Sequence, residues 1–196
     1  MNFPLNKSQN DPLEEQPGQE QSPQEFDIRQ FLRSWVLPLF AEVAALLLVF
    51  NFILNITYVP SGSMIPTIAE HSVLLSVREY DTEHLQRGEI YSFRSDELDK
   101  TLIKRLIGLP GETVRIEGNG NVYIDDQLLD EPYVVNQEYG YTGTFTIPEG
   151  CYFFLGDNRS GSSDARYWDD PYTPADQVVS RAVFTFFPFG NFGLLK

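Results

Sequence analysis

The chain has 196 residues, 42% of them hydrophobic and 14% aromatic, with a formal net charge of -14 at pH 7. This length suits one folded domain with appendages. A chain this acidic, without a cluster of lysines and arginines, is not expected to bind nucleic acid through its phosphates. The single cysteine, Cys151, excludes a disulfide within the chain, and His71 and His84 lie too far apart for a HExxH zinc site. We therefore expect no metal and no nucleic-acid partner.

Residues 1–27 contain four prolines among glutamine, serine, asparagine and acidic residues, and they show no apolar periodicity. A segment of this composition buries too little apolar surface to fold. We predict a disordered, acidic tail over residues 1–27.

Residues 28–57 become strongly apolar, above all from Trp35 to Ile56. About 20 helical residues cross the roughly 30 Å hydrocarbon core of a bilayer, so this segment predicts one transmembrane anchor helix. A cleaved signal peptide is the alternative, but it would need a basic region before a shorter apolar core and a small-residue cleavage site after it. Here the apolar segment is longer, the tail before it is acidic, and residues 55–58 contain no Ala-x-Ala pattern. Glu42 lies within the apolar run, and the sequence gives it no role.

Basic residues next to a membrane span indicate its orientation. Arg29 and Arg33 lie at the amino end of the predicted span, whereas the first basic residue beyond it is Arg78. We therefore expect a single-pass membrane protein with a cytoplasmic amino terminus. Residues 58–196 would be extracytoplasmic, at a plasma membrane or an internal energy-transducing membrane.

Residues 58–196 predict a mainly β domain. Short runs of β-branched and aromatic residues alternate with turns rich in glycine, proline, asparagine and aspartate. Because no long helical period intervenes, an antiparallel sheet or barrel is favoured over an alternating α/β fold. The expected strands cover residues 72–77, 89–93, 101–107, 113–116, 121–124, 144–147, 152–155 and 178–187.

A serine-rich turn directly follows the apolar run. Residues 60–67 read Pro-Ser-Gly-Ser-Met-Ile-Pro-Thr, and the two prolines and the glycine disfavour a helix here. Taken alone, such a turn is most often an ordinary loop. A catalytic role would also require a neighbouring base, because a serine hydroxyl is a weak nucleophile without one.

The expected strand at residues 101–107 supplies a candidate base. Strand alternation places Lys104 and Arg105 on opposite faces, so we expect one of them to be buried and the other exposed. Burial lowers the pKa of a lysine from about 10.4, by as much as about 3 to 5 units, and so makes a neutral amine available. The alternative is an ordinary strand lysine whose amine reaches water. The sequence does not decide which face is buried.

A third segment, residues 155–167, is dense in hydrogen-bonding side chains and contains charges of both signs. It fits either a solvated polar turn or a loop that braces the lysine amine through hydrogen bonds and ion pairs.

Together the three segments resemble type I signal peptidase, the membrane-bound serine protease that removes signal peptides from exported proteins. Residues 60–67 resemble the nucleophile box of this family, residues 104–112 its lysine box, and residues 156–166 its carboxyl-side box. Residues 87–90 resemble a further family segment, although Glu89 stands where aspartate is more usual. Other departures are Ala165, Ser180 and residues 169–171, and none of them falls on an expected catalytic residue.

The resemblance implies a membrane-bound serine endopeptidase with Ser63 as nucleophile and Lys104 as general base. It implies that the Ser61 hydroxyl and the Ser63 backbone amide stabilise the oxyanion, and that Ser162 orients the Lys104 amine. The implied substrates are preprotein signal peptides, cut after Ala-x-Ala.

The resemblance further implies that Asp164 and Arg166 hold the loop in shape. No metal or other cofactor is implied, and the partners would be the preprotein and the lipid bilayer.

Three alternatives remain open. A self-cleaving serine–lysine regulator would be soluble and would cut an Ala-Gly bond, whereas this chain has an apolar span and no Ala-Gly dipeptide. An inactive membrane-tethered binding module is disfavoured because serine and lysine are both present. A Ser-His-Asp site would need His71 as its base.

Overall fold

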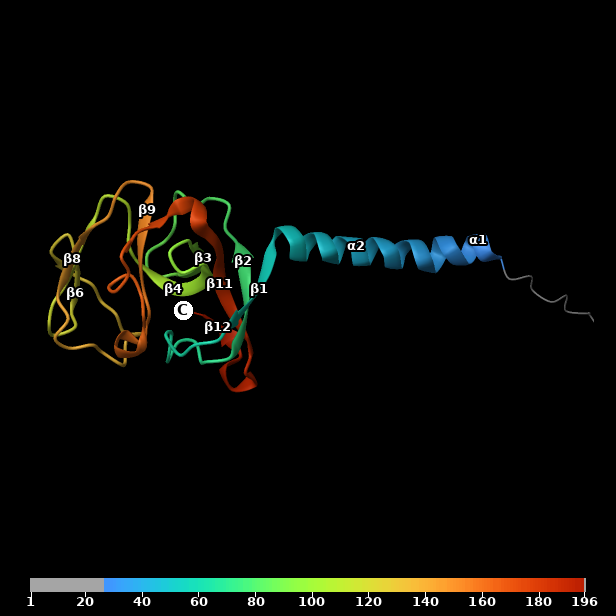
Figure 1. Cartoon of the computed structure of the whole chain (residues 1–196). Coiled ribbons are helices and arrows are strands. Elements are labelled where there is room, and N and C mark those ends of the chain that lie inside the picture. Colours follow the sequence, from blue (N-terminus) through green and yellow to red (C-terminus); the bar gives the residue numbers. More distant parts are fainter. Residues whose placement is uncertain (1–26, 196) are drawn as a thin grey trace, which may run out of the picture. The chain divides into compact units, whose positions relative to one another are not determined.

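The computed structural model describes residues 27–195, and the predicted tail at residues 1–26 lies outside the described residues. The chain divides into two units, residues 1–42 and residues 43–196. Figure 1 labels the helices and strands.

The apolar run forms a helix from Ile28 to Phe52. It consists of α1 (Ile28–Phe31), a π-helical turn η1 (Leu32–Val36) and α2 (Leu37–Phe52). The carboxylate of Asp27 caps its start by accepting hydrogen bonds from the backbone N–H groups of Arg29 and Gln30. An 18-residue stretch of this 25-residue helix has a mean hydropathy of 2.0, and no residue of the helix is buried. The helix is therefore long and apolar enough to cross a membrane.

The helix ends five residues earlier than predicted. The expected anchor included residues 53–57, but Leu54–Val59 form strand β1, which pairs with β2 (Ser72–Arg78) over six residues. At the junction the backbone N–H of Arg78 donates to the carbonyl of Ile53 at 2.8 Å. The carboxyl end of the apolar run therefore belongs to the sheet, because β2, which follows later in the chain, satisfies its backbone hydrogen bonds.

The strands of the described residues form two antiparallel sheets. The larger sheet has the order β1-β2-β11-β3-β4-β9-β10, with β12 paired to β11. Besides β1 and β2 it contains β3 (Ile90–Ser95), β4 (Lys100–Gly108), β9 (Cys151–Leu155), β10 (Thr173–Pro174), β11 (Val178–Phe187) and β12 (Gly193–Leu194).

The smaller sheet has the order β7-β6-β5-β8. Its strands are β5 (Thr113–Ile116), β6 (Val122–Ile124), β7 (Gln127–Leu128) and β8 (Gly143–Thr146). Figure 1 shows β6 and β8 on one side of β9, with β2, β3 and β11 on the other. Short 3-10 turns η2 (Arg159–Gly161), η3 (Ala175–Gln177) and η4 (Phe189–Asn191) complete the fold.

The predicted fold class is confirmed: the chain is mainly antiparallel β with one amino-terminal apolar helix. All eight expected strands form, within two residues of their predicted bounds. The additional strands β7, β10 and β12 have two residues each, too few for a period-two pattern to reveal.

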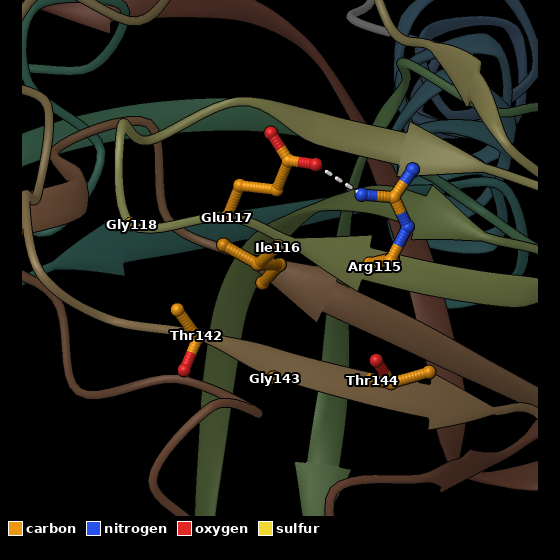
Figure 2. Close-up of a pocket in the computed structure, with 7 residues that line it drawn as sticks. All are labelled: Arg115, Ile116, Glu117, Gly118, Thr142, Gly143 and Thr144. Carbon is orange, nitrogen blue, oxygen red and sulfur yellow. Dashed lines mark hydrogen bonds and ion pairs between the residues drawn. The ribbon is translucent and has the colours of Figure 1, made fainter.

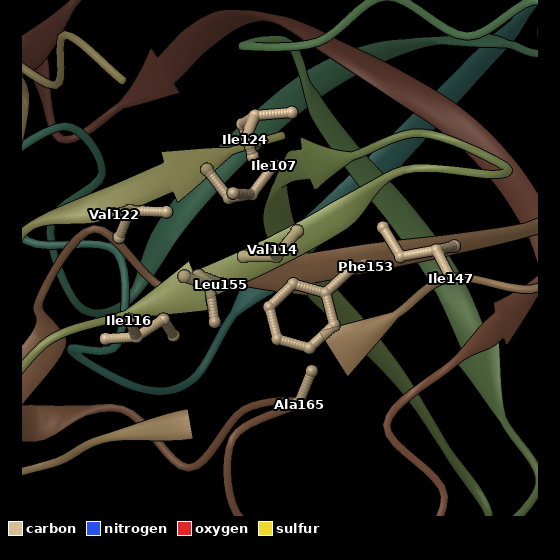
Figure 3. Packing of buried hydrophobic residues seen from close by; sticks show 9 residues of the cluster. All are labelled: Ile107, Val114, Ile116, Val122, Ile124, Ile147, Phe153, Leu155 and Ala165. Atoms are coloured by element: carbon tan, nitrogen blue, oxygen red, sulfur yellow. The ribbon is translucent and has the colours of Figure 1, made fainter. Parts of the chain in front are cut away.

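One hydrophobic cluster joins the two sheets. It includes Ile107 from β4, Phe153 and Leu155 from β9, and Val114 from β5, and Figure 3 shows these side chains facing one another. Gly108 permits this approach, because a Cβ there would lie 2.2 Å from a side-chain carbon of Ile147. The smaller sheet therefore packs directly on the β4–β9 pair.

Strand β4 is buried on both faces, contrary to our expectation. Ile103 belongs to a cluster with Val59 and Met64, whereas Leu106 packs in a cluster with Phe154 and other residues from β3 and β9. Lys104 and Arg105 are consequently both buried, with 4% and 1% of their surface exposed. The prediction that one of these two basic residues would be exposed was wrong, because both sides of a central strand are covered by core.

Candidate active site

The serine-rich turn connects β1 to β2 and is anchored by apolar residues. Val59, Met64 and Ile68 are fully buried in one cluster. The turn is closed by a hydrogen bond from the N–H of Ile65 to the carbonyl of Gly62 at 3.2 Å. Because residues before and after Ser63 are fixed in the core, its hydroxyl is held in one place.

Ser63 and Lys104 meet in this position. The Nζ of Lys104 lies 2.7 Å from the Oγ of Ser63, and only 6% of Ser63 is exposed. The same amine donates to the carbonyl of Ile103 at 3.2 Å. The structure therefore brings together a hydroxyl and an amine from segments 41 residues apart, in the contact that proton transfer requires.

Burial lowers the pKa of Lys104 to about 8, although the charges of Asp164 and Asp157 partly oppose this change. A lysine with this pKa is neutral in half of the molecules near pH 8. The buried amine is thus able to accept a proton from a neighbouring hydroxyl near neutral pH.

Ser61 lies beside this pair. Its Oγ is 3.4 Å from the Oγ of Ser63, and it lines a cleft between β1 and the first half of β4. The cleft has a volume of about 330 Å³ and is bordered by residues 55–58, residues 60 and 61, and residues 101–104. The described part of the larger sheet pairs nothing with the outer edge of β1, so backbone groups at this edge are available to an extended peptide.

Ser162 lies near the site but does not form the hydrogen bond to the Lys104 amine that the resemblance implied. It is buried, and its Oγ has no hydrogen-bond partner among the described residues, so the expected hydrogen bond to the Lys104 amine is not formed. A Cβ placed on Gly156 would lie 2.2 Å from Ser162 Oγ and 2.6 Å from the carbonyl oxygen of Ser63. Ser162 therefore lies beside the backbone of Ser63, where Gly156 leaves room for both.

Asp164 and Arg166 brace the loop around Ser162. Both side chains are buried, and the Nε and Nη2 of Arg166 donate to the two carboxylate oxygens of Asp164 at 2.7 and 2.9 Å. Asp164 also accepts from the N–H of Gly156 at 2.9 Å, and Arg166 donates to the carbonyl of Arg159 at 2.7 Å. A bidentate pair of this kind fixes both geometry and charge.

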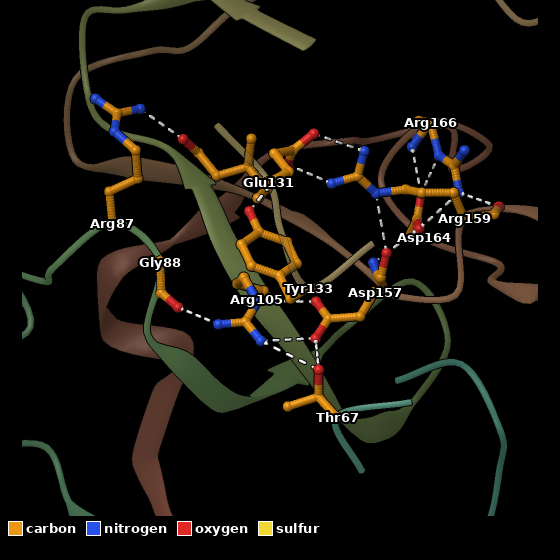
Figure 4. A network of polar contacts seen from close by, with 12 residues as sticks. Thr67, Arg87, Gly88, Arg105, Glu131, Tyr133, Asp157, Arg159, Asp164 and Arg166 are labelled. Carbon is orange, nitrogen blue, oxygen red and sulfur yellow. Dashed lines mark hydrogen bonds and ion pairs between the residues drawn. The ribbon is translucent and has the colours of Figure 1, made fainter. Parts of the chain in front are cut away.

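A second buried ion pair connects all three segments and was not predicted. Arg105 donates to both carboxylate oxygens of Asp157, at 2.8 and 2.6 Å, and Thr67 donates to the same carboxylate at 2.5 Å. Figure 4 shows this network, with the ring of Tyr133 against the guanidinium of Arg105. The strand of Lys104, the turn of Ser63 and the polar loop are thereby tied together. The sequence contains both charged residues, but no local pattern in it indicates that they form a pair.

Removing one member of this pair is expected to destabilise the domain strongly. Arg105→Ala would leave the Asp157 carboxylate buried and unpaired, which typically costs about 3–5 kcal/mol. Arg94→Ala is the matched control, because Arg94 pairs with Asp96 and Asp99 at an exposed site, where a change of less than about 0.5 kcal/mol is usual. The free energy of unfolding of each detergent-solubilised variant, compared with that of the parent chain, measures both effects. Equal losses of stability in the two variants would contradict the role of the buried pair.

Other candidate groups do not join the site. His71 is exposed and its Nδ1 lies 2.7 Å from the hydroxyl of Tyr58, whereas the side chain that contacts the Ser63 hydroxyl at 2.7 Å is Lys104. Cys151 is partly buried on β9, and burial raises the pKa of its thiol. Among residues 27–195 no group of three or more histidine, cysteine, aspartate or glutamate side chains is placed to hold a metal ion.

A separate hollow lies on the smaller sheet. It has a volume of about 370 Å³ and is lined by residues 115–118, at the end of β5, and residues 142–144, at the start of β8. Figure 2 shows these residues with the ion pair of Arg115 and Glu117. Arg115 also pairs with Asp126 at 3.3 Å and stacks on the ring of Tyr123. Because its charge is already neutralised by two carboxylates, Arg115 does not make this hollow a site for an anion.

A long apolar helix, an antiparallel β domain and a buried serine–lysine contact define a class: membrane-anchored proteins with a hydrolase-type site. The family model for signal peptidase, peptidase S26, matches residues 32–187. Since that match covers most of the chain, the protein belongs to this family. The resemblance noted in the sequence is confirmed.

Curated relatives agree with this assignment. The chain is 36% identical over 152 residues to probable signal peptidase I-2 of Synechocystis, which covers 74% of this chain and 68% of that protein. It is 35% identical over 176 residues to probable signal peptidase I-1 of Synechocystis, covering 85% of this chain and 88% of the relative. Signal peptidase IB of Staphylococcus aureus is 30% identical over 184 residues, covering 84% and 94%.

A solved structure of a signal peptidase I from Enterococcus faecalis is 36% identical in sequence. It covers 48% of this chain and 93% of its own, with a TM-score of 0.42.

Proposed function

We propose that this protein is a membrane-bound serine endopeptidase that removes N-terminal signal peptides from exported preproteins. The observation that carries the proposal is the 2.7 Å contact between the buried Lys104 amine and the Ser63 hydroxyl. The lowered pKa of Lys104 supports its use as a base. The substrate class is supported by relatives that are named signal peptidase I or probable signal peptidase I.

The proposed reaction uses groups of the chain itself. Neutral Lys104 accepts the proton of Ser63 as the Ser63 oxygen attacks the scissile carbonyl carbon. The resulting oxyanion accepts hydrogen bonds from the Ser61 hydroxyl and the Ser63 N–H, which stabilise charge that develops only during the reaction. The Lys104 ammonium then protonates the departing amine, leaving an ester between Ser63 and the signal peptide. Lys104 next deprotonates a water molecule that hydrolyses this ester and restores Ser63.

The cleft between β1 and β4 is the proposed binding site for the substrate. An extended peptide lying there would add its backbone hydrogen bonds to the free edge of β1. The cleft is small, about 330 Å³, and includes the apolar side chains of Ile56 and Ile103. These features support a preference for small side chains at the first and third positions before the cut, the Ala-x-Ala pattern.

We further propose that the amino terminus is cytoplasmic and that residues 58–196 face the opposite side of the membrane. Arg29 and Arg33 at the start of the helix support this orientation. In sealed vesicles whose extracytoplasmic membrane face points outward, an added protease would then digest the β domain; protection of that domain would contradict the orientation.

Cleavage at a defined bond is the expected result when the detergent-solubilised chain is incubated with a preprotein. Mass spectrometry of the product should place the cut after Ala-x-Ala. Changing the last alanine before the cut to phenylalanine should lower the rate by at least about 100-fold, because the proposed preference for small side chains requires a subsite that a bulky ring does not enter. Equal cleavage of both substrates would contradict the proposed specificity, and an intact preprotein would contradict the proposed activity.

A further inference from the structure

Asn158 donates hydrogen bonds to the backbone on both sides of the Ser63 Cα. Its side-chain Nδ2 donates to the carbonyl of Gly62 at 2.9 Å, and its own backbone N–H donates to the carbonyl of Ser63 at 3.0 Å. Asn158 follows Asp157 in the polar loop and is partly buried. One residue of the polar loop therefore contacts the two peptide groups that flank the Cα of Ser63.

The first of these peptide groups is the proposed oxyanion donor. The carbonyl of Gly62 and the N–H of Ser63 belong to the same planar peptide unit, and in a trans peptide they point in opposite directions. A donor that fixes the direction of the Gly62 carbonyl consequently fixes the direction of the Ser63 N–H. In addition, a hydrogen bond accepted by the carbonyl polarises the N–H at the other end and strengthens it as a donor.

The Asn158 side chain is itself held in orientation. Its Oδ1 accepts a hydrogen bond from Asn136 Nδ2 at 3.1 Å, which leaves Nδ2 to face Gly62. The N–H of Ser160 donates to the Asn136 carbonyl at 3.2 Å, so Asn136 is linked to the same loop. Gly161 provides the necessary room, because a Cβ there would lie 2.5 Å from Asn158 Nδ2. The amide is thus oriented before any substrate arrives.

We infer that Asn158 is a positioning residue for the oxyanion hole, acting through the Gly62–Ser63 peptide group. This inference rests on the proposed function, since it requires Ser63 to be the nucleophile. Asn158 makes no hydrogen bond to Lys104 or to the Ser63 hydroxyl in the described residues. Its loss should therefore weaken stabilisation of the tetrahedral intermediate while the base keeps its pKa.

The test compares Asn158→Ala with the parent chain in detergent, using a preprotein substrate and a peptide aldehyde that ends in alanine. The aldehyde carbon would bond to the Ser63 oxygen and form a hemiacetal whose oxygen occupies the oxyanion hole. We expect kcat to fall about 10- to 100-fold, less than or equal to the effect of deleting an oxyanion donor outright. KM should change by less than about twofold, and inhibition by the aldehyde should weaken in proportion to kcat.

Two further variants serve as comparisons. Asn119→Ala removes an exposed asparagine from a turn of the smaller sheet, and it should leave kcat unchanged. Asn136→Ala removes the group that orients the Asn158 amide but keeps the donor to Gly62. It should lower kcat by a smaller factor, about two- to fivefold, and because Asn136 is exposed it provides the test if Asn158→Ala does not fold.

The outcomes separate this inference from the proposed function. Retention of activity by a Ser63→Ala chain would overturn both. An inactive Ser63→Ala chain together with full kcat in Asn158→Ala would overturn the positioning role alone. That role would also fail if Asn158→Ala raised KM as much as it lowered kcat, or if it moved the pH midpoint of kcat/KM, since either result would indicate general disruption of the loop.

Discussion

Ser63→Ala is expected to abolish cleavage of a preprotein, lowering kcat by roughly 10⁴- to 10⁶-fold as in other serine hydrolases that lose their nucleophile. Without the Ser63 oxygen no acyl intermediate forms, and the neutral Lys104 amine has no hydroxyl to activate. The variant should fold, because only one buried hydroxyl is removed, from a turn that Met64 and Ile68 anchor in the core. Gel-based product formation over several hours would measure the residual rate.

Ser160→Ala is the matched control for this variant. Ser160 lies in the polar loop, is exposed, and contacts Asn136 through its backbone N–H, which alanine retains. Its activity should equal that of the parent chain. Cleavage by Ser63→Ala at more than about one hundredth of the parent rate would sink the assignment of the nucleophile, because that loss is far smaller than the removal of a covalent nucleophile causes.

Lys104→Met is expected to lower kcat by a similar factor, since methionine fills much of the same volume but accepts no proton.

In the parent chain kcat/KM should rise with pH and level off above about pH 8, because only the neutral amine acts as a base and the pKa of Lys104 is about 8. Below this value the rate should fall about tenfold for each pH unit, as the neutral fraction does. Initial rates between pH 6 and 10 measure this profile.

Lys104→Met should also stabilise the domain near pH 7. Burial holds the pKa of Lys104 below its ordinary value, so the folded chain binds fewer protons than the unfolded chain between about pH 8 and 10.5. The free energy of unfolding therefore decreases as the pH falls from about 10.5 to about 8, and it keeps this lower value below pH 8. Replacing the amine removes this cost, which is up to about 3 kcal/mol. The melting temperature at pH 7 should rise while activity disappears.

Lys100→Met serves as the control, because Lys100 begins the same strand but is exposed. It should keep the parent rate, pH profile and melting temperature. A Lys104→Met chain that cleaved normally, or a parent profile that stayed flat between pH 6 and 9, would show that another group is the base.

The strands were predictable from the sequence because their signals are local. Residues 113–116 and 178–187 combine β-branched residues with flanking turn residues, and both segments form strands at the predicted bounds. The end of the apolar helix was not predictable in this way. Leu54 and Ile56 are as apolar as the residues before them, and only pairing with Val77 and Leu75 makes them a strand.

The candidate site divides in the same manner. The turn at residues 60–67 and the Lys104 strand were recognisable from their residue types and order, and the structure places Ser63 and Lys104 in contact. The pairing of Arg105 with Asp157 and the two hydrogen bonds of Asn158 to the serine turn were not recognisable. Arg105 and Asp157 are 52 residues apart in the sequence, and Gly62 and Asn158 are 96 residues apart. No local pattern encodes contacts over such separations.

Residue types and their spacing were enough to predict one apolar helix followed by a mainly β domain and to select Ser63 and Lys104 as candidates, because composition and spacing are properties of short segments. Three features depend instead on long-range packing. Both faces of β4 are covered, the Lys104 amine lies 2.7 Å from the Ser63 hydroxyl, and Asn158 donates a hydrogen bond to the Gly62–Ser63 peptide group. The physical reason is burial. Whether an amine is neutral and whether a hydroxyl meets it depend on what packs around them, and that packing comes from strands far apart in the chain.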